Sequence, residues 1–144
     1  MKVSVILENK PSDDIATITP EHPVRDAVGA LSSRRIGALV VSRSGSDIQG
    51  IVSERDIIRR MGKNGVSVLE RPVSEIMTAP VETCFLSETA LEILSRMTEG
   101  RFRHMPVTNS AGQMTGILSI GDVVKARLEE IEAENAAMAD MLSS

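Results

Sequence analysis

Hydrophobic residues recur along this chain with two periods, and the two alternate in an order that occurs twice. Val24, Ala27, Val28 and Leu31 follow the i, i+3, i+4, i+7 spacing of an amphipathic helix, which predicts a helix over Val24–Arg34. The short apolar runs around it are typical of buried strands. The first half is therefore expected to hold strands at Ile15–Ile18, Ala38–Val41 and Ile48–Val52 and a second helix that includes Asp56–Met61.

The second half of the chain has the same order of elements. Strands are expected at Glu82–Cys84, His104–Thr108 and Met114–Leu118, with helices over Ala90–Thr98 and from Ile120 onward. Turn-forming residues at Ser44–Asp47 and Asn109–Gly112 separate the last two strands of each half. Between the halves, Pro72 is expected to open a short helix over Val73–Met77.

The two halves are copies of one sequence unit. Residues 50–56 read Gly-Ile-Val-Ser-Glu-Arg-Asp and residues 116–122 read Gly-Ile-Leu-Ser-Ile-Gly-Asp, 66 positions later. The same offset carries Arg35 onto Arg101, whereas Val3–Ile6 resembles Val73–Ile76 at an offset of 70. A repeat of this kind predicts two copies of one supersecondary unit.

Each unit has about 60 residues, a size at which a domain buries too little surface to be more than marginally stable. We therefore expect one α/β (α+β) domain in which two pseudo-symmetric β-α-β-β-α repeats pack sheet to sheet, with a C-terminal helix. The expected boundaries are 1–63 for repeat 1, 64–71 for a linker, 72–127 for repeat 2 and 128–144 for the C-terminal helix.

Composition narrows the class of protein. A net charge of −4, with no Trp, no Tyr and two Phe, argues against a nucleic-acid partner, which would favour a basic surface or stacking aromatics. No apolar run approaches the roughly 18 residues of a membrane span, and no signal peptide is apparent. The single cysteine, Cys84, is expected to be buried and inert, and His22 to be solvated. We expect a cytoplasmic protein with no membrane contact and no metal site.

These features resemble a known family. The resemblance is carried by three features: the doubled strand–helix–strand–strand–helix order, Gly-Ile-x-Ser-x-x-Asp after each last strand, and Arg103-His104-Met105-Pro106-Val107. The chain resembles a tandem pair of cystathionine-β-synthase (CBS) domains, or Bateman module, of the stand-alone bacterial type. The resemblance extends from Val3 to about Arg127. It implies a regulatory module that binds an adenine nucleotide in the cleft between the repeats and has no catalytic cofactor.

The Ser-x-x-Asp motif has two interpretations. Ser53 and Asp56 fit a capping box at the start of a helix, as do Ser119 and Asp122. The same helix N-terminus suits a phosphate, and a carboxylate can accept hydrogen bonds from both hydroxyls of a ribose. Aspartates folded back onto their own backbone, together with a cleft filled by apolar side chains, would exclude the ligand interpretation.

The resemblance implies two composite binding sites, because in the family each site takes residues from both repeats. Arg103 and His104 suit a phosphate, and the second site has Gly37 and Ala38 at the matching positions, with Arg34 and Arg35 as alternative sources of charge. The first implied site joins Ser53, Arg55 and Asp56 with Thr83, Arg103, His104, Met105 and Pro106; the second joins Ser119 and Asp122 with Thr17, Ile36, Gly37 and Ala38. Phe102 and Met105 are also candidates for the core, and Arg101 for either ligand contact or protection of a strand edge.

The C-terminal segment has a coiled-coil spacing. Its seam positions are Val124, Leu128, Ile131, Asn135, Met138 and Leu142, at intervals of 4-3-4-3-4. They cover only two to three heptads, so an amphipathic helix lying on its own domain is an equal alternative. Either form is compatible with the homodimer that we expect.

Two functions of different class follow. The first is a sensor that binds AMP, ADP, ATP, NAD(H) or S-adenosyl methionine and signals to an effector protein that the sequence does not identify. The second is a dimerisation scaffold without a ligand, in which the Ser/Asp pairs are helix caps. An enzyme is a distant third, because the sequence lacks a Ser/His/Asp order, a P-loop and a G-x-G-x-x-G motif.

Overall fold

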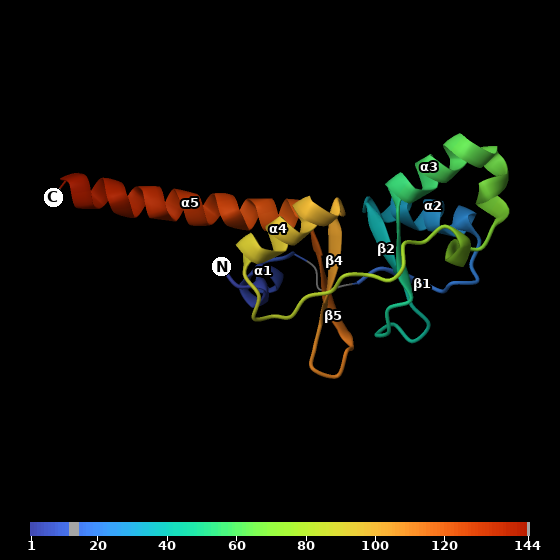
Figure 1. Ribbon diagram of the computed structural model, residues 1–144, viewed down its shortest axis with the longest axis horizontal. Coiled ribbons are helices and arrows are strands. Elements are labelled where there is room, and N and C mark those ends of the chain that lie inside the picture. The colour runs from blue at the N-terminus through green and yellow to red at the C-terminus, as the bar shows by residue number, and fades with distance from the viewer. Residues whose placement is uncertain (12–14, 144) are drawn as a thin grey trace.

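The computed structural model describes residues 1–11 and 15–143, and it has the expected repeated order of helices and strands (Figure 1). The first half contains α1 (Val3–Glu8), β1 (Thr17–Ile18), α2 (Val24–Arg34), β2 (Ala38–Val41), β3 (Gly50–Ser53) and α3 (Glu54–Asn64). Two 3₁₀ helices follow, η1 (Gly65–Glu70) and η2 (Val73–Glu75). The second half contains α4 (Ala90–Gly100), β4 (His104–Thr108), β5 (Met114–Ser119) and α5 (Ile120–Ser143).

Each repeat forms its own small sheet. In the first, β2 pairs with β1 in parallel and with β3 antiparallel; in the second, β4 pairs antiparallel with β5. The strand expected at Glu82–Cys84 is absent from the sheet: a single parallel bridge joins Cys84 to Val107. This bridge is equivalent to the pairing of Ile18 with Val41 in the first repeat, so the second sheet retains the topology of the first with a shorter third strand.

The repeat extends to backbone conformation. Arg35, the residue after α2, has φ 54°, and Arg101, the residue after α4 and 66 positions later, has φ 57°, both in the left-handed region. A left-handed residue at the end of a helix allows its backbone N–H to bond the last carbonyl groups, as Arg35 does with Leu31 and Ser32. The chain therefore turns in the same way after each helix and leads into β2 and β4.

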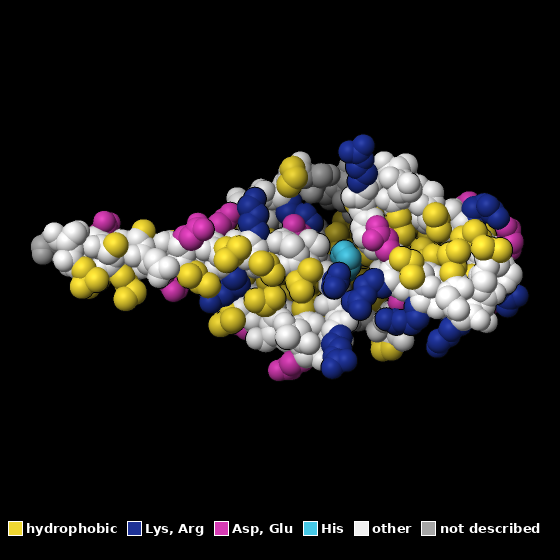
Figure 2. All heavy atoms as spheres, turned by 90° about the horizontal axis from the view of Figure 1, so that it is seen from above, with side chains coloured by type: hydrophobic (Ala, Val, Ile, Leu, Met, Phe, Trp, Pro, Cys, Tyr) yellow, Lys and Arg dark blue, Asp and Glu magenta, His cyan; other side chains and the backbone are white. Residues whose placement is uncertain are grey.

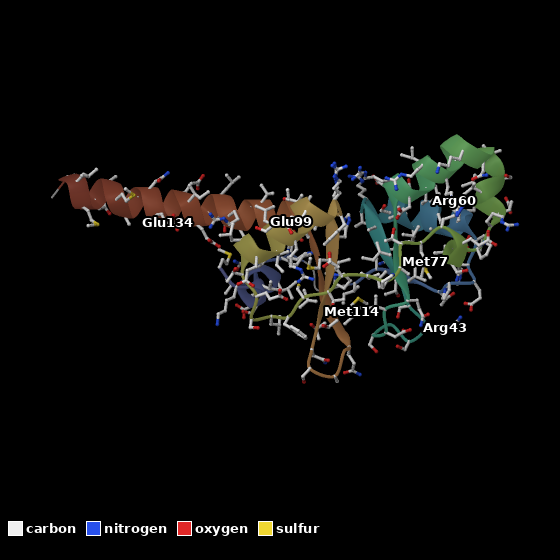
Figure 3. The ribbon with its side chains drawn as sticks, viewed as in Figure 1. Arg43, Arg60, Met77, Glu99, Met114 and Glu134 are labelled. Carbon is white, nitrogen blue, oxygen red and sulfur yellow. The ribbon has the colours of Figure 1, made fainter. Side chains whose placement is uncertain are left out.

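Among the described residues, three apolar clusters hold the fold together. One fills each repeat between its helices and its sheet, and includes Leu39 in the first repeat and Ile93 in the second. The third cluster joins the two sheets: Ala38, Val40 and Ile51 pack with Met114. Figure 3 shows Met114 where the two sheets come together. The sheet-to-sheet packing expected from the sequence is confirmed.

The segments at offset 70 are exchanged between the repeats. Val3 and Ile6 of α1 lie in the core of the second repeat, whereas Val73 and Ile76 lie in the core of the first. Each segment covers a glycine on the last strand of the repeat that it completes. A Cβ atom at Gly50 would lie 2.6 Å from the sulfur of Met77, and a Cβ at Gly116 would lie 2.9 Å from a methyl carbon of Leu7. Figure 3 shows Met77 beside the first sheet.

Helix α5 joins the helix expected from Ile120 and the C-terminal helix expected over 128–144 into one element. It begins at Ile120, so the helix expected over 128–144 is its distal part, of which Ser144 lies outside the described residues. The proximal part packs on the second repeat through Val123 and Ala126, and the distal part projects away from the domain (Figure 1). The alternative in which this segment lies on its own domain is therefore wrong for the distal part. No helix in residues 1–11 and 15–143 combines the length and apolarity that crossing a membrane requires.

Candidate functional site

A cavity of about 450 Å³ lies between the two repeats. One wall is formed by the end of β3 and the first turns of α3, with Ser53, Arg55 and Asp56. The opposite wall is formed by residues 100–104, between α4 and β4, with Arg103 and His104. All five residues belong to the first implied site, and the fold brings them together.

Asp56 forms the capping box that the sequence predicts as one of two alternatives. Its Oδ2 accepts hydrogen bonds from the backbone N–H and the hydroxyl of Ser53, both at 2.9 Å, while the Ser53 oxygen accepts from the Asp56 N–H at 3.2 Å. The other carboxylate oxygen, Oδ1, accepts a longer bond of 3.3 Å from Thr78. Capping therefore occupies one oxygen fully, and the carboxylate still lines the cavity.

The cavity wall is rich in arginine. Arg55, Arg59, Arg101 and Arg103 all line it, together with the acidic residues Glu54, Asp56 and Glu82. Figure 2 shows Lys and Arg side chains gathered where the two halves of the molecule meet. Arg59 is a wall residue that the sequence motifs do not indicate, although its position one helical turn after Arg55 places the two on one face of α3.

Three residues of the first implied site lie away from this cavity. Met105 is fully buried in the core of the second repeat, which is the other role expected for it, and Pro106 is a buried residue of β4 outside that cluster. Thr83 lines a separate hollow near the Asn109–Gly112 turn. Phe102 belongs to both environments, because it lines the cavity and packs against the core.

A second cavity, of about 620 Å³, lies on the other side of the cleft. Its wall includes Ile36, Gly37, Ala38 and Ser119, as the second implied site requires. Arg34 and Arg35 also line it and supply positive charge. Thr17 lies outside this cavity, in a hollow on the outer side of β1, and its place on the wall is taken by Ala16.

Lys10 occupies the region around Asp122. Its ammonium group lies 2.9 Å from Asp122 Oδ2 and donates to the carbonyl of Ile117 at 2.8 Å. The same Oδ2 accepts from the Ser119 N–H at 2.9 Å, while the Ser119 hydroxyl caps the Asp122 N–H at 3.2 Å. Burial favours a raised pKa for the Asp122 carboxyl, but the bonds from Ser119 and Lys10 outweigh it and lower the pKa.

No sequence pattern points to Lys10, because it reaches Ile117 across 107 residues of chain. The ion pair between Lys10 and Asp122 also makes the two sites chemically different. Asp122 faces a lysine, and it does not appear on the wall of the second cavity, whereas Asp56 lines the first.

His104 and Gly37 line both cavities. A Cβ atom on Gly37 would lie 3.3 Å from Cε1 of the His104 ring, so the absence of a side chain at Gly37 lets the imidazole stand between the two sites. Burial lowers the pKa of His104, against the raising influence of Asp122 and Glu54. The imidazole is therefore disposed to be neutral at neutral pH.

Two features together would exclude a ligand: aspartates folded back onto their own backbone, and a cleft filled by apolar side chains. Only the first is present. Both aspartates are folded back onto their own backbone. The cleft, however, is not filled by apolar side chains: its walls carry arginines, acids and an imidazole. A cavity with a helix N-terminus and several guanidinium groups can bind a phosphate, and an adjacent carboxylate can bind hydroxyls.

Comparison with solved structures identifies close neighbours of this fold. A CBS-domain-containing protein from Agrobacterium tumefaciens is 38% identical, with a TM-score of 0.83 over 88% of this chain and 99% of that one. A CBS domain protein from Pyrobaculum aerophilum, solved as a complex with AMP, is 23% identical, with a TM-score of 0.74 over 85% of this chain and 89% of that one. At that identity, the second neighbour establishes the fold alone.

Sequence comparison gives the same result. The mitochondrial CBS domain-containing protein CBSX3 of Arabidopsis thaliana is 38% identical over 120 residues, which are 81% of this chain and 58% of the relative. The chain thus spans little more than half the length of that relative. The family model described as "CBS domain" matches twice, at residues 6–63 and 73–129. Together with the paired sheets and the cleft between them, these matches show that the chain belongs to the CBS domain family, as a tandem pair.

Proposed function

We propose that this protein is a regulatory module that binds an adenine nucleotide in the cleft between its CBS repeats and does not catalyse a reaction. CBS pairs of this fold bind adenine ligands: the Pyrobaculum protein was solved with AMP, and the CBS pair of protein MJ0100 with 5′-methylthioadenosine and S-adenosyl-L-methionine. We choose among AMP, ADP, ATP, NAD(H) and S-adenosyl methionine from the residues that line this chain's own cavities.

The observation that carries the proposal is the first cavity. Asp56 lies at the N-terminus of α3 on one wall, and Arg101 and Arg103 lie on the other. This arrangement supports a ligand with a diol at one end and a phosphate at the other. We therefore favour the ligands that carry phosphate, with the ribose hydroxyls on Asp56 and the phosphate among the arginines.

The second cavity supports a weaker or different ligand. Asp122 is paired with Lys10 and does not line this cavity, so a ribose there lacks the carboxylate that Asp56 offers in the first cavity. We propose that the two sites fill unequally and that the first fills at lower nucleotide concentration. The same proposal assigns the walls of these two sites to Ser53, Arg55, His104, Ser119, Ile36, Gly37 and Ala38.

Isothermal titration with AMP, ATP, NADH and adenosine tests this function in the full chain. Asp56→Asn keeps the shape of the cap but loses the charge, and we expect it to weaken AMP binding at the tighter site by about 10- to 100-fold, since a hydrogen bond to a charged group contributes about 1.5–3 kcal/mol. The matched variant Asp122→Asn should leave that site unchanged. Equal affinity of Asp56→Asn and the unaltered protein would remove the ribose assignment.

A dimerisation scaffold without ligand is the second candidate, because both aspartates form helix caps. If it is correct, no adenine compound will bind in the titration or raise the melting temperature. In either case we propose that the chain forms a homodimer. Large apolar side chains are exposed on the outward faces of helices from both repeats, among them Val28 on α2, Ile58 on α3, Leu91 on α4 and Val124 on α5.

A further inference from the structure

The distal part of α5 is a helix that makes little contact with its own domain. The last residue with a partly buried side chain is Glu130, which bonds the N-terminal amino group at 2.5 Å. Residues 131–143 are all exposed and extend about 20 Å beyond that contact, at 1.5 Å per residue. Figure 3 shows Glu134 on this projecting part. An isolated helix of this length is marginal in water, so a partner is needed to stabilise it.

The exposed side of the helix carries the coiled-coil seam. Leu128 is 55% exposed, Ile131 40%, Met138 61% and Leu142 86%. At 100° per residue, the centre of the seam lies about 130° around the helix from the face that Val123 and Ala126 bury against the domain. The seam therefore points away from the face that packs on the domain, and its side chains from Leu128 onward are exposed.

We propose that this seam pairs with the same seam of a second copy of the chain, as a parallel, in-register, two-stranded coiled coil. This deepens the homodimer part of the proposed function and is independent of ligand binding. In heptad notation, Leu128, Asn135 and Leu142 are a positions, and Val124, Ile131 and Met138 are d positions. Asn135 then faces Asn135 of the second copy, where the two amides can bond each other and fix the register.

The charges beside the seam select the parallel direction. In a parallel pair, a g residue faces the following e residue of the other helix, which brings Arg127 to Glu132 of the second copy, twice by symmetry. In the antiparallel register that pairs all six seam positions, Glu132 faces Glu132 and Glu134 faces Glu134 of the second copy. Like charges oppose each other at both places, so this register is disfavoured.

A shorter antiparallel register does place opposite charges together, but it fails at the seam. It brings Lys125 to Glu132 and Arg127 to Glu134 of the second copy. Asn135 then opposes Val124, which offers its amide no hydrogen-bond partner, and Met138 and Leu142 extend beyond the seam. Arg127 already donates through Nη1 to Glu130 at 2.6 Å, and its remaining guanidinium donors are sufficient for the parallel contact.

Site-specific crosslinking of the full chain tests the direction. Leu142→Cys places a thiol at an a position, and the matched variant Ala133→Cys places one on the outer face of the same helix. The native Cys84 does not interfere, because it is buried and burial raises the pKa of its thiol to about 12. We expect an oxidised dimer from Leu142→Cys and none from Ala133→Cys. In the full antiparallel overlap the two introduced thiols of Leu142→Cys would lie roughly 27 Å apart, too far to form a disulfide.

A charge variant gives an independent readout by sedimentation. Glu132→Arg should weaken dimerisation roughly tenfold, because it replaces two attractive contacts with repulsive ones, whereas Glu134→Arg, which faces Ala139 in the parallel pair, should leave it unchanged. Equal crosslinking of both cysteine variants, or equal effects of both arginine variants, overturns the coiled coil. A dimer that shows no Leu142→Cys crosslink also overturns the coiled coil, and it would mean that the two copies pair through their CBS domains. A monomer overturns both the coiled coil and the homodimer, while nucleotide titration of the same samples reports separately on ligand binding.

Discussion

At the scale of single residues, one side chain serves both the fold and the proposed site. The Oδ2 atom of Asp56 caps α3, and its Oδ1 atom is engaged only by the longer bond from Thr78 among the hydrogen bonds found in the described residues. A carboxylate has about four positions at which it can accept hydrogen bonds. Helix capping and ribose binding are therefore compatible, and the cap holds the carboxylate rigidly at the mouth of the cavity.

His104 makes the stability of the protein depend on pH. Burial lowers the pKa of His104 in the folded state below the unfolded value of about 6.5. As the pH falls, the unfolded chain therefore binds a proton at His104 more readily than the folded chain does. Stability is therefore expected to fall as the pH drops from about 7.5 to 5.5. Thermal unfolding across this range should show the decline, and His104→Gln should reduce its slope.

The control for this measurement is the other histidine. His22 is exposed and hydrogen-bonded locally to Thr19, so His22→Gln should leave the slope as it is in the unaltered protein. If His104→Gln also leaves the slope unchanged, a different group is responsible for the pH dependence. The partly buried imidazole of His104 would then not stand between the sites as a neutral side chain.

At the scale of helices and strands, the repeat predicts most of the fold because local patterns and the 66-residue offset reinforce each other. Helix α2 and strand β2 have the expected bounds. The expected strand at Glu82–Cys84 is a single bridge instead, since strand formation depends on a partner that sequence pattern does not specify. Contacts between residues distant along the chain cannot be predicted from the sequence pattern either. The pattern does not indicate that Lys10 reaches Asp122. It also does not decide between the core and the ligand site for Met105, which lies in the core.

The exchange of the N-terminal segments leads to a prediction about α1. Ile6 is 4% exposed in the core of the second repeat, although it lies far along the chain from α4. Ile6→Ala should lower the free energy of unfolding by about 2–5 kcal/mol, as buried Ile→Ala changes do, because it leaves a cavity beneath β4 and β5. Chemical denaturation measures this change.

The neighbouring residue provides the matched control. Val5 lies on the same helix and is 39% exposed, so Val5→Ala should cost much less than Ile6→Ala. Similar small effects from both variants would mean that α1 is not part of the second core and that each repeat is complete without the exchanged segment.

At the scale of the whole molecule, both cavities lie where the two repeats meet. The cluster of Ala38, Val40, Ile51 and Met114 fixes one sheet against the other, and Gly37 and His104 line both cavities directly beside it. The exchanged segments link the two cores further, so neither repeat has a complete interior without residues from the other half of the chain. The site therefore exists only while both repeats are folded and packed.

This dependence predicts how a ligand changes unfolding. Because the repeats share cores, the unligated protein should unfold in one cooperative transition, and a nucleotide that touches both repeats should shift that transition as a whole. At a free concentration of about 100 times the Kd, binding to one site adds about 2.7 kcal/mol, which corresponds to a rise in melting temperature on the order of 10 °C for a domain of this size. Calorimetry with AMP measures the shift, and Asp56→Asn should reduce it at the same AMP concentration. Two separate transitions, of which the nucleotide moves only one, would mean that the ligand binds within a single repeat and that the cleft is not its site.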